Sequence, residues 1–263
     1  MTTVGEILHF VERLAPRDMK MDWDNVGLLC GSRGQKVTKV LVALDPFEGV
    51  CRETADWGAE LLVTHHPLIF RPTSSITDET SVGRAVMLLC ANGISAVNAH
   101  TNLDCAPGGV NDILARTLGL KNIRVAAPSG TDAQGRPWGL LRCGEIGQQP
   151  LGAFLAHVKQ ALGCPGLRYV SGGKPVRFVA VGGGSCADGM LDALNAGCDT
   201  FVTADVRYNQ FWDAHDLGLN LIDAGHFYTE NPVTAYLAAE MAAQFPQLTV
   251  KISETHTDCM KFY

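Results

Sequence analysis

A strand–helix–strand pattern early in the chain constrains its fold more than any other feature of the sequence. Apolar residues predict a strand at Lys39–Leu44, and Pro46–Trp57 has the composition of a helix that Gly58 closes. Glu60–Thr64 is a second short apolar run, typical of a strand that is buried on both faces. Two such strands joined by a helix predict a parallel sheet covered by helices, and therefore an α/β fold.

The same pattern recurs in the second half of the sequence. Val42–Thr64 aligns without gaps on Val181–Thr203, with glycine at the same place before the second strand and Val-Thr at its end. We therefore predict two related three-layer α/β domains that arose by internal duplication. The predicted halves are residues 1–125 and 126–263, with the boundary in a proline- and glycine-rich connector at 121–137.

Metal-ligating side chains follow several of the predicted strands. Two adjacent histidines come after one apolar run, and two further runs lead into a histidine that precedes a carboxylate by four residues. Ligands collect outside the carboxyl ends of parallel strands, so we expect a metal site there, between the two domains. The predicted ligands are His65, His66 and Asp104 from the N-terminal half and His226 and Glu230 from the C-terminal half.

The chemistry of this donor set narrows the choice of metal. Three imidazoles and two carboxylates suit a first-row divalent ion such as zinc, manganese, iron or nickel, whereas calcium and magnesium prefer oxygen ligands. Adjacent side chains on an extended backbone diverge, so we expect His65 and His66 to serve two ions that a glutamate bridges. Five ligands for two ions leave positions for water, which favours catalysis. Taken singly, each histidine favours a hydrogen-bonded core or surface residue over a ligand, and the metal site rests on the five residues together.

Two further features have more than one interpretation. His100 occupies the repeat position of His226 and fits a metal ligand, a group that supports a ligand or a general base; we favour the last two and assign it as the catalytic residue. Asp24, Asn25 and Asp205 either line the site or cap turns. The turn Gly182–Ser185 fits a phosphate contact through backbone amides, or a tight turn that needs glycine.

Composition excludes several classes of protein. The 263 residues carry a formal net charge of -6 without clustered lysine and arginine, which disfavours a nucleic-acid partner. Nine cysteines without a C-x-x-C spacing indicate reduced thiols and a cytoplasmic location. No segment has the pattern of a signal peptide, and no apolar run approaches the roughly 20 residues of a membrane span.

Several motifs together, in order along essentially the whole chain, resemble those of the Nif-three-like family, also known as GTP cyclohydrolase 1 type 2 homologues. These motifs are Trp23–Leu28, Thr64–Leu68, His100–Asp104, Gly182–Ser185 and Gly225–Glu230. The resemblance implies a two-domain α/β fold, a ring-shaped homohexamer and a dinuclear metal site. One departure is Cys186, which stands where many relatives have glycine and weakens the phosphate interpretation of the adjacent turn.

The resemblance also assigns the ligands and an activity. It implies that His66 and Asp104 hold one ion, that His65 and His226 hold the other, and that Glu230 bridges both. The implied activity is that of a metal-dependent hydrolase in which activated water attacks the ring of a purine nucleotide. Nothing in the sequence encodes guanine recognition. The alternatives are a metal storage or chaperone protein without a substrate, and a phosphoesterase acting on nucleotides or nucleic acid.

Overall fold

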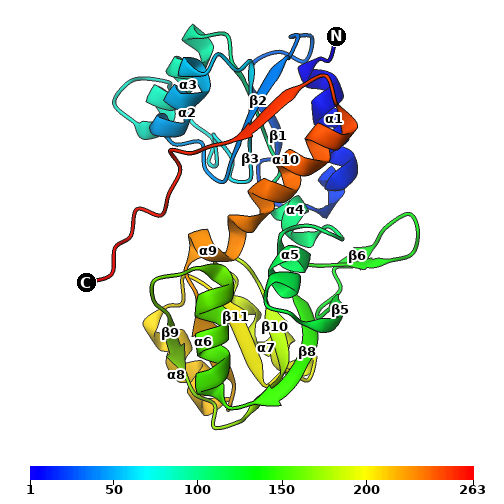
Figure 1. Cartoon of the computed structure of the whole chain (residues 1–263), viewed down its shortest axis with the longest axis vertical. Coiled ribbons are helices and arrows are strands. Elements are labelled where there is room, and N and C mark those ends of the chain that lie inside the picture. The colour runs from blue at the N-terminus through cyan, green and yellow to red at the C-terminus, as the bar shows by residue number, and fades with distance from the viewer. The chain divides into compact units, whose positions relative to one another are not determined.

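The computed structural model describes the whole chain, residues 1–263, which divides into two compact units. Unit 1 comprises Met1–Leu103 and Val233–Asp258, and unit 2 comprises Asp104–Pro232 and Cys259–Tyr263. Each unit is built around its own mixed β-sheet with helices beside it (Figure 1). None of the helices combines the length and the apolar character that crossing a membrane requires.

Unit 1 is organised on a five-stranded sheet. Its strands are β1 (Gly27–Cys30), β2 (Lys39–Ala43), β3 (Leu61–Thr64), β4 (Ser95–Asn98) and β13 (Thr249–Ile252). The strand order is β1-β4-β3-β2-β13, and only the β1–β4 pair is antiparallel. The helical elements are α1 (Val4–Leu14), η1 (Arg17–Met19), α2 (Glu48–Asp56), α3 (Ser81–Ala91), α4 (Thr101–Cys105) and α10 (Pro232–Gln244). The chain passes from unit 1 to unit 2 within α4 and returns at the start of α10.

The sheet of unit 1 buries both of its faces. Leu41 of β2 and Leu62 of β3 belong to a core cluster that includes Val50 of α2 and Leu89 of α3. Figure 1 shows α2 and α3 on this face and α1 and α10 on the other. This explains why the strands are apolar throughout instead of alternating with polar residues.

Unit 2 is organised on a six-stranded sheet. Its strands are β5 (Lys121–Val125), β8 (Arg142–Gln149), β9 (Arg168–Val170), β10 (Val176–Val181), β11 (Thr200–Thr203) and β12 (Asn220–Asp223), and a separate hairpin is formed by β6 (Gly130–Thr131) and β7 (Pro137–Trp138). The sheet order is β5-β8-β10-β11-β12-β9. The helical elements are α5 (Val110–Thr117), α6 (Leu151–Leu162), η2 (Ala187–Gly189), α7 (Met190–Asn195), α8 (Tyr208–Asp216) and α9 (His226–Glu230).

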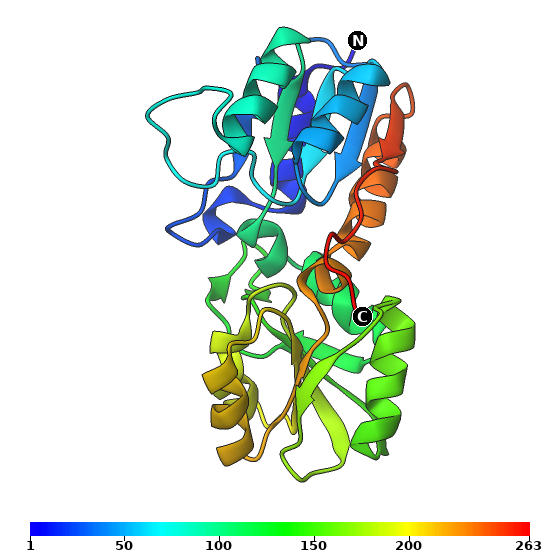
Figure 2. The same ribbon diagram turned by 90° about the vertical axis from the view of Figure 1, so that its left-hand side faces the viewer.

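Alternate residues of the central strands of unit 2 face opposite layers. Val179 and Val202 pack with residues of α5 and α6. Their neighbours Ala180 and Phe201 pack with residues of α7 and α8. Figure 2 shows α6 and α8 on opposite sides of the sheet. The predicted α/β fold with helices on both faces is therefore confirmed.

The structure also corrects parts of the sequence interpretation. The strand expected at Trp138–Cys143 is instead Arg142–Gln149, and the expected connector 121–137 contains β5 and the β6–β7 hairpin. The two compact units have other bounds than the halves 1–125 and 126–263, since β13 pairs with β2 in unit 1 and Asp104 begins unit 2. The domain boundary itself stays a prediction. Three parallel strands joined by helices occur in each unit, as a duplication requires, but the duplication itself stays a prediction.

Candidate metal centre

The first two predicted ligands lie directly beyond the end of β3. The backbone amides of His65 and His66 donate to the carbonyls of Ala43 and Leu44 at 3.3 and 2.9 Å. The parallel pairing of β3 with β2 therefore continues for two residues past the strand and fixes the origin of both imidazoles. His65 is completely buried, whereas His66 is partly exposed.

His100 joins these two histidines. It follows β4, the other neighbour of β3 in the sheet, so its imidazole emerges from the same end of unit 1. The ligand nitrogens of His65, His66 and His100 lie within 4.8 Å of one another. The ring centroids of the three pairs are 4.9, 5.2 and 5.4 Å apart. Unit 1 thus gathers three imidazoles from two adjacent strand ends.

Each of the three imidazoles is oriented through its Nδ1 atom. The contacts are His65 to the Ala99 carbonyl at 2.9 Å, His66 to Asp45 at 2.6 Å and His100 to Asp24 at 2.8 Å. A carbonyl or carboxylate oxygen can only accept here, so Nδ1 carries the hydrogen and the lone pair of the neutral ring is on Nε2. Metal-ligating histidines are held in this way by acceptors behind them.

Unit 2 contains a second group of predicted ligands, in which a histidine is again held at Nδ1 by an oxygen acceptor. His226 and Glu230 are the first and last residues of α9, one helical turn apart, and their Nε2 and Oε2 atoms are 2.9 Å apart. Asp205 Oδ2 lies 2.7 Å from His226 Nδ1. Burial disfavours the charged form of His226, but the two carboxylates outweigh that effect and raise its pKa to about 11. The electrostatic environment of α9 therefore strongly favours a cation.

Asp104 also belongs to unit 2 and is almost completely buried. The carboxylates of Asp104 and Glu230 both influence the thiol of Cys186. Burial and these two negative charges raise the pKa of Cys186 well above the ordinary value. Within unit 2 the structure thus brings together the predicted ligands Asp104, His226 and Glu230. Two buried carboxylates beside a histidine are the kind of donor set that is expected of a cation site.

The glycine turn after β10 approaches these ligands closely. A Cβ atom on Gly184 would overlap Glu230 Oε1 and lie 3.0 Å from His226 Nε2, and Gly184 has a φ of +61°. The amides of Gly183 and Gly184 already donate to Asn111 Oδ1 and Thr229 Oγ1, at 2.7 and 3.0 Å. The glycines are therefore required by close packing, and the phosphate interpretation of this turn is not supported.

Sequence reasoning missed two contributors to unit 1. Asp45 lies two residues beyond β2, as His66 does beyond β3, and its second oxygen lies 2.7 Å from Nε2 of His256. The position of Asp45 at a strand end was a usable signal. His256 had none, because it comes from the C-terminal segment, 211 residues away in sequence. Asp24, for which the sequence left the role open, accepts from His100 and Thr101.

The residues present fit a first-row divalent metal. Buried histidine, aspartate and glutamate side chains form groups that can hold an ion, and the four histidines each have an acceptor behind Nδ1. Imidazole and carboxylate ligands without thiolates match zinc, manganese, iron or nickel better than a soft monovalent metal. The number and the identity of the ions stay predictions.

Comparisons with known proteins all match this chain to one group of related proteins. The model of the Duf34/NIF3 (NGG1p interacting factor 3) family matches residues 2–259. A Clostridium perfringens protein named GTP cyclohydrolase 1 type 2 homolog is 37% identical over 232 residues, which cover 88% of this chain and 87% of the relative. A Helicobacter pylori protein named GTP cyclohydrolase 1 type 2 is 30% identical over 248 residues, which cover 94% of this chain and 95% of the relative.

A solved structure supports the fold over its full length. The Bacillus cereus protein related to NIF3 superposes with a TM-score of 0.93 at 27% sequence identity, and the match covers 100% of this chain and 99% of that protein. The arrangement of strands and helices in both units is therefore shared with that protein.

Proposed function

This chain belongs to the Duf34/NIF3 family, and from that membership and its donor groups we propose that it is a metal-dependent hydrolase with two divalent ions per chain. The observation that carries the proposal is that all four histidines of the donor groups are held at Nδ1 by an oxygen acceptor. A histidine with only a structural role does not require this orientation. A metal-ligating histidine does, because an acceptor behind Nδ1 fixes the ring and leaves Nε2 for the ion.

The proposed ligand assignment follows the resemblance stated above. His66 and Asp104 bind one ion, His65 and His226 bind the other, and Glu230 binds both. Asp45 and Asp205 support this assignment, because each holds one of the histidines at the nitrogen opposite to the proposed ligand atom. When bound, two such ions polarise the substrate and increase the acidity of an attacking water.

His100 is proposed as the general base. Its Nδ1 donates to Asp24, so Nε2 can take a proton from the attacking water and return it to the leaving group. Burial raises the pKa of Asp24, but the hydrogen bonds from His100 and Thr101 outweigh that effect and lower the pKa to about 2. Asp24 therefore stays ionised at neutral pH and stabilises the imidazolium that forms on His100.

Exposed aromatic rings beside His100 support a planar substrate. Trp23 is 63% exposed and Phe70 is 41% exposed. Their ring centroids are 5.7 Å apart, and they lie 6.2 and 5.9 Å from the His100 ring. Large apolar side chains left in solvent next to polar reactive groups suit stacking on a heterocycle. A purine nucleotide is the proposed substrate, as the names of the relatives suggest.

Assembly and location complete the proposal. We propose a ring-shaped homohexamer, as the family resemblance implies, working in the cytoplasm, where the nine free cysteines stay reduced. Light scattering of the purified chain tests the assembly, because a particle of six chains is readily distinguished from a monomer or a dimer.

The proposed function is tested with the full-length chain loaded with zinc, manganese, iron or nickel in turn. We expect two ions per chain by elemental analysis, and GTP turnover that a chelator abolishes and that added metal restores. Turnover of phosphoesters but not of GTP would replace the proposal with a phosphoesterase. Metal transfer to an apo acceptor, with no turnover of GTP, phosphoesters or cyclic amides, would replace it with a storage or chaperone role.

Substitution of Asp24 by asparagine separates proton transfer from metal binding. We expect kcat to fall about 10- to 100-fold, since supporting residues typically have effects of this size, while the metal content stays unchanged. Asp24→Glu should recover part of the activity, because it restores the carboxylate. The matched control is Asp22→Asn, which removes an exposed carboxylate two residues away. Equal kcat values for the Asp24→Asn and Asp22→Asn variants would contradict the proposed role.

A further inference from the structure

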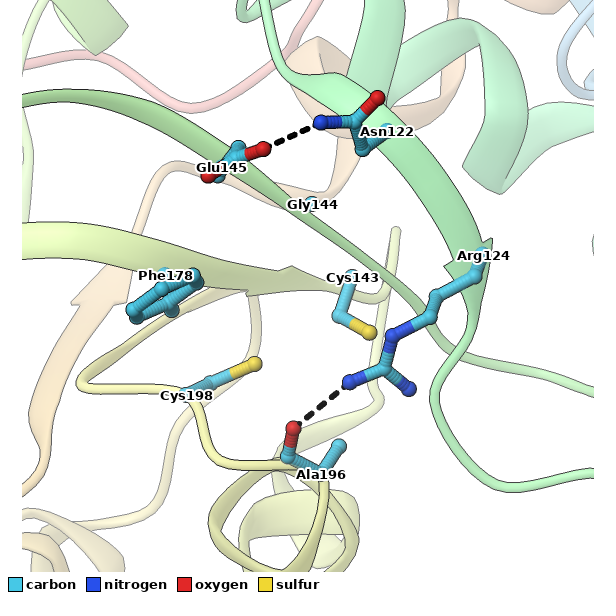
Figure 3. A pocket seen from close by; sticks show the side chains of 8 residues that line it. All are labelled: Asn122, Arg124, Cys143, Gly144, Glu145, Phe178, Ala196 and Cys198. Atoms are coloured by element: carbon cyan, nitrogen blue, oxygen red, sulfur yellow. Dashed lines mark hydrogen bonds between the residues drawn. The ribbon is translucent and has the colours of Figure 1, made fainter.

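A cavity in unit 2 has no part in the proposed metal chemistry. Its volume is about 240 Å³, enough for several water molecules of about 30 Å³ each. It is lined by Asn122, Arg124, Cys143, Gly144, Glu145, Phe178, Ala196 and Cys198. Figure 3 shows the sulfur atoms of Cys143 and Cys198 facing this cavity beside the Arg124 guanidinium. The cavity therefore combines two thiols and a cation.

The register of the sheet places the cation next to one of the thiols. Arg124 of β5 is the direct cross-strand partner of Cys143 of β8. Side chains of directly paired residues on one sheet face have Cβ atoms about 4.5–5.5 Å apart. The Arg124 Nη2 atom also donates to the carbonyl of Ala196 at 2.8 Å, which holds the guanidinium over the cavity. The position of this charge is thus fixed by the fold.

The second thiol comes from the turn between α7 and β11. The amide of Cys198 donates to the Ala193 carbonyl at 3.0 Å, and the preceding Gly197 has a φ of +85°. Cys143 and Cys198 belong to the same buried cluster on the α7 and α8 face of the sheet. Both are nearly enclosed by protein, so the cavity is the route by which a small reagent reaches them.

The two thiols differ in acidity. The interaction with Cys198 and the charge of Arg124 outweigh burial and lower the pKa of Cys143. The same interaction raises the pKa of Cys198, which therefore keeps its proton. At neutral pH a larger fraction of Cys143 than of an ordinary cysteine is therefore thiolate.

We propose that Cys143 and Cys198 form a peroxide-reactive dithiol site, in which Cys143 beside Arg124 is the attacking residue and Cys198 the resolving one. The geometry that carries this inference is the shared cavity, the cross-strand position of Arg124 and the convergence of two thiols from separate elements. The site is independent of the metal ligands and of the hydrolase proposal.

The reaction balances with hydrogen peroxide as the oxidant. The Cys143 thiolate attacks one peroxide oxygen, the O–O bond breaks, and the departing hydroxide takes a proton to become water; the product at Cys143 is a sulfenic acid. The Cys198 sulfur then attacks the Cys143 sulfur, the S–O bond breaks, and the Cys198 proton leaves with the hydroxyl as a second water. Two thiols are oxidised to one disulfide by two electrons, and one peroxide is reduced to two waters.

A second pair of cysteines provides an internal comparison. The sulfur atoms of Cys30 and Cys90 in unit 1 are 3.4 Å apart. Burial and the neighbouring Cys90 raise the pKa of Cys30 to about 12. Two neighbouring thiols without a nearby cation thus make a poor nucleophile, and Cys143 should react much faster than Cys30 at pH 7.

The test treats the full-length chain with hydrogen peroxide in iron-free buffer at pH 7 and maps the peptides by mass spectrometry. We expect a Cys143–Cys198 cross-link as the first product. The Cys198→Ser variant should accumulate a sulfenic acid at Cys143 that dimedone traps, and the Cys143→Ser variant should leave Cys198 reduced. Oxidation that starts at the exposed Cys90 or Cys259 while Cys143 stays reduced would overturn the proposal.

The role of the cation is tested separately. Arg124→Met should slow alkylation of Cys143 by iodoacetamide roughly fivefold at pH 7, because the thiolate fraction falls. The matched control is Arg177→Met, which removes an arginine whose guanidinium carbon lies over the Phe178 ring, 4.8 Å from its centroid. Unchanged or equal alkylation rates in the two variants would exclude the proposed influence of Arg124.

Discussion

Replacing Glu230 by glutamine is expected to reduce the metal content from two ions per chain to one or none and to abolish turnover. Glu230 is only 4% exposed and lies against His226 on α9. Glutamine keeps the size of the side chain but removes the negative charge and the second anionic oxygen that a bridging ligand needs. Supporting residues alone can change metal affinity by about 10- to 100-fold, so loss of a shared ligand should exceed the upper value.

Elemental analysis of dialysed protein and GTP turnover measure these effects. The matched control is Asp216→Asn, which alters an exposed histidine–carboxylate contact, since Asp216 lies 3.3 Å from His215 on the surface. This control should keep both its metal and its activity. A Glu230→Gln variant that retains two ions per chain and full turnover would refute the dinuclear proposal.

Replacing Arg142 by methionine is expected to destabilise the protein by about 3–5 kcal/mol, which is typical when one partner of a buried ion pair is removed. Arg142 is 2% exposed, and its Nε atom donates to Asp112 at 2.8 Å. Its other nitrogens donate to the carbonyls of Gly139, Cys105 and Ala106 at 2.6–3.1 Å. Methionine leaves these acceptors without a donor in a buried place.

Chemical denaturation measures the loss, and a surface pair provides the control. Arg136 makes a similar contact of 2.7 Å with Asp132, but the arginine side chain is 63% exposed. Arg136→Met should therefore change the free energy of unfolding by no more than about 1 kcal/mol. Arg142 binds the carbonyls of the two residues that directly follow the proposed ligand Asp104. Loss of Arg142 should therefore also weaken metal binding. Equal stabilities of the two variants would show that the buried network contributes little.

Local patterns predicted the parts of the fold that depend on neighbours in sequence. The capping box that opens α1 follows from the local spacing of Thr3 and Glu6. The bounds of β3 agree with the predicted strand to within one residue. The prediction therefore placed His65 and His66 correctly at the end of a strand. The spacing of His226 and Glu230 is one helical turn, which α9 realises. These features needed only the periods of strand and helix.

Long-range pairing accounts for what the sequence did not reveal. The pairing of β13 with β2 matches Val250 to Val40, and no local pattern identifies such a partner. The contact of His256 with Asp45 depends on that pairing, so it was equally hidden. The β5–β8 register that sets Arg124 beside Cys143 involves the polar edge strand β5, for which a hydrophobic pattern specifies little. The joint dinuclear arrangement of the five ligands stays a prediction.

The discontinuous make-up of unit 1 has a consequence for biosynthesis. Its first segment ends at Leu103, but α10 and the edge strand β13 are translated only with Val233–Asp258. The ribosome therefore releases the nearly contiguous unit 2 before unit 1 has all its parts, the reverse of the usual order in which the N-terminal domain folds first. Proteolysis of nascent chains before and after their release from the ribosome should reveal late protection of residues near the N-terminus, and early protection there would contradict this order.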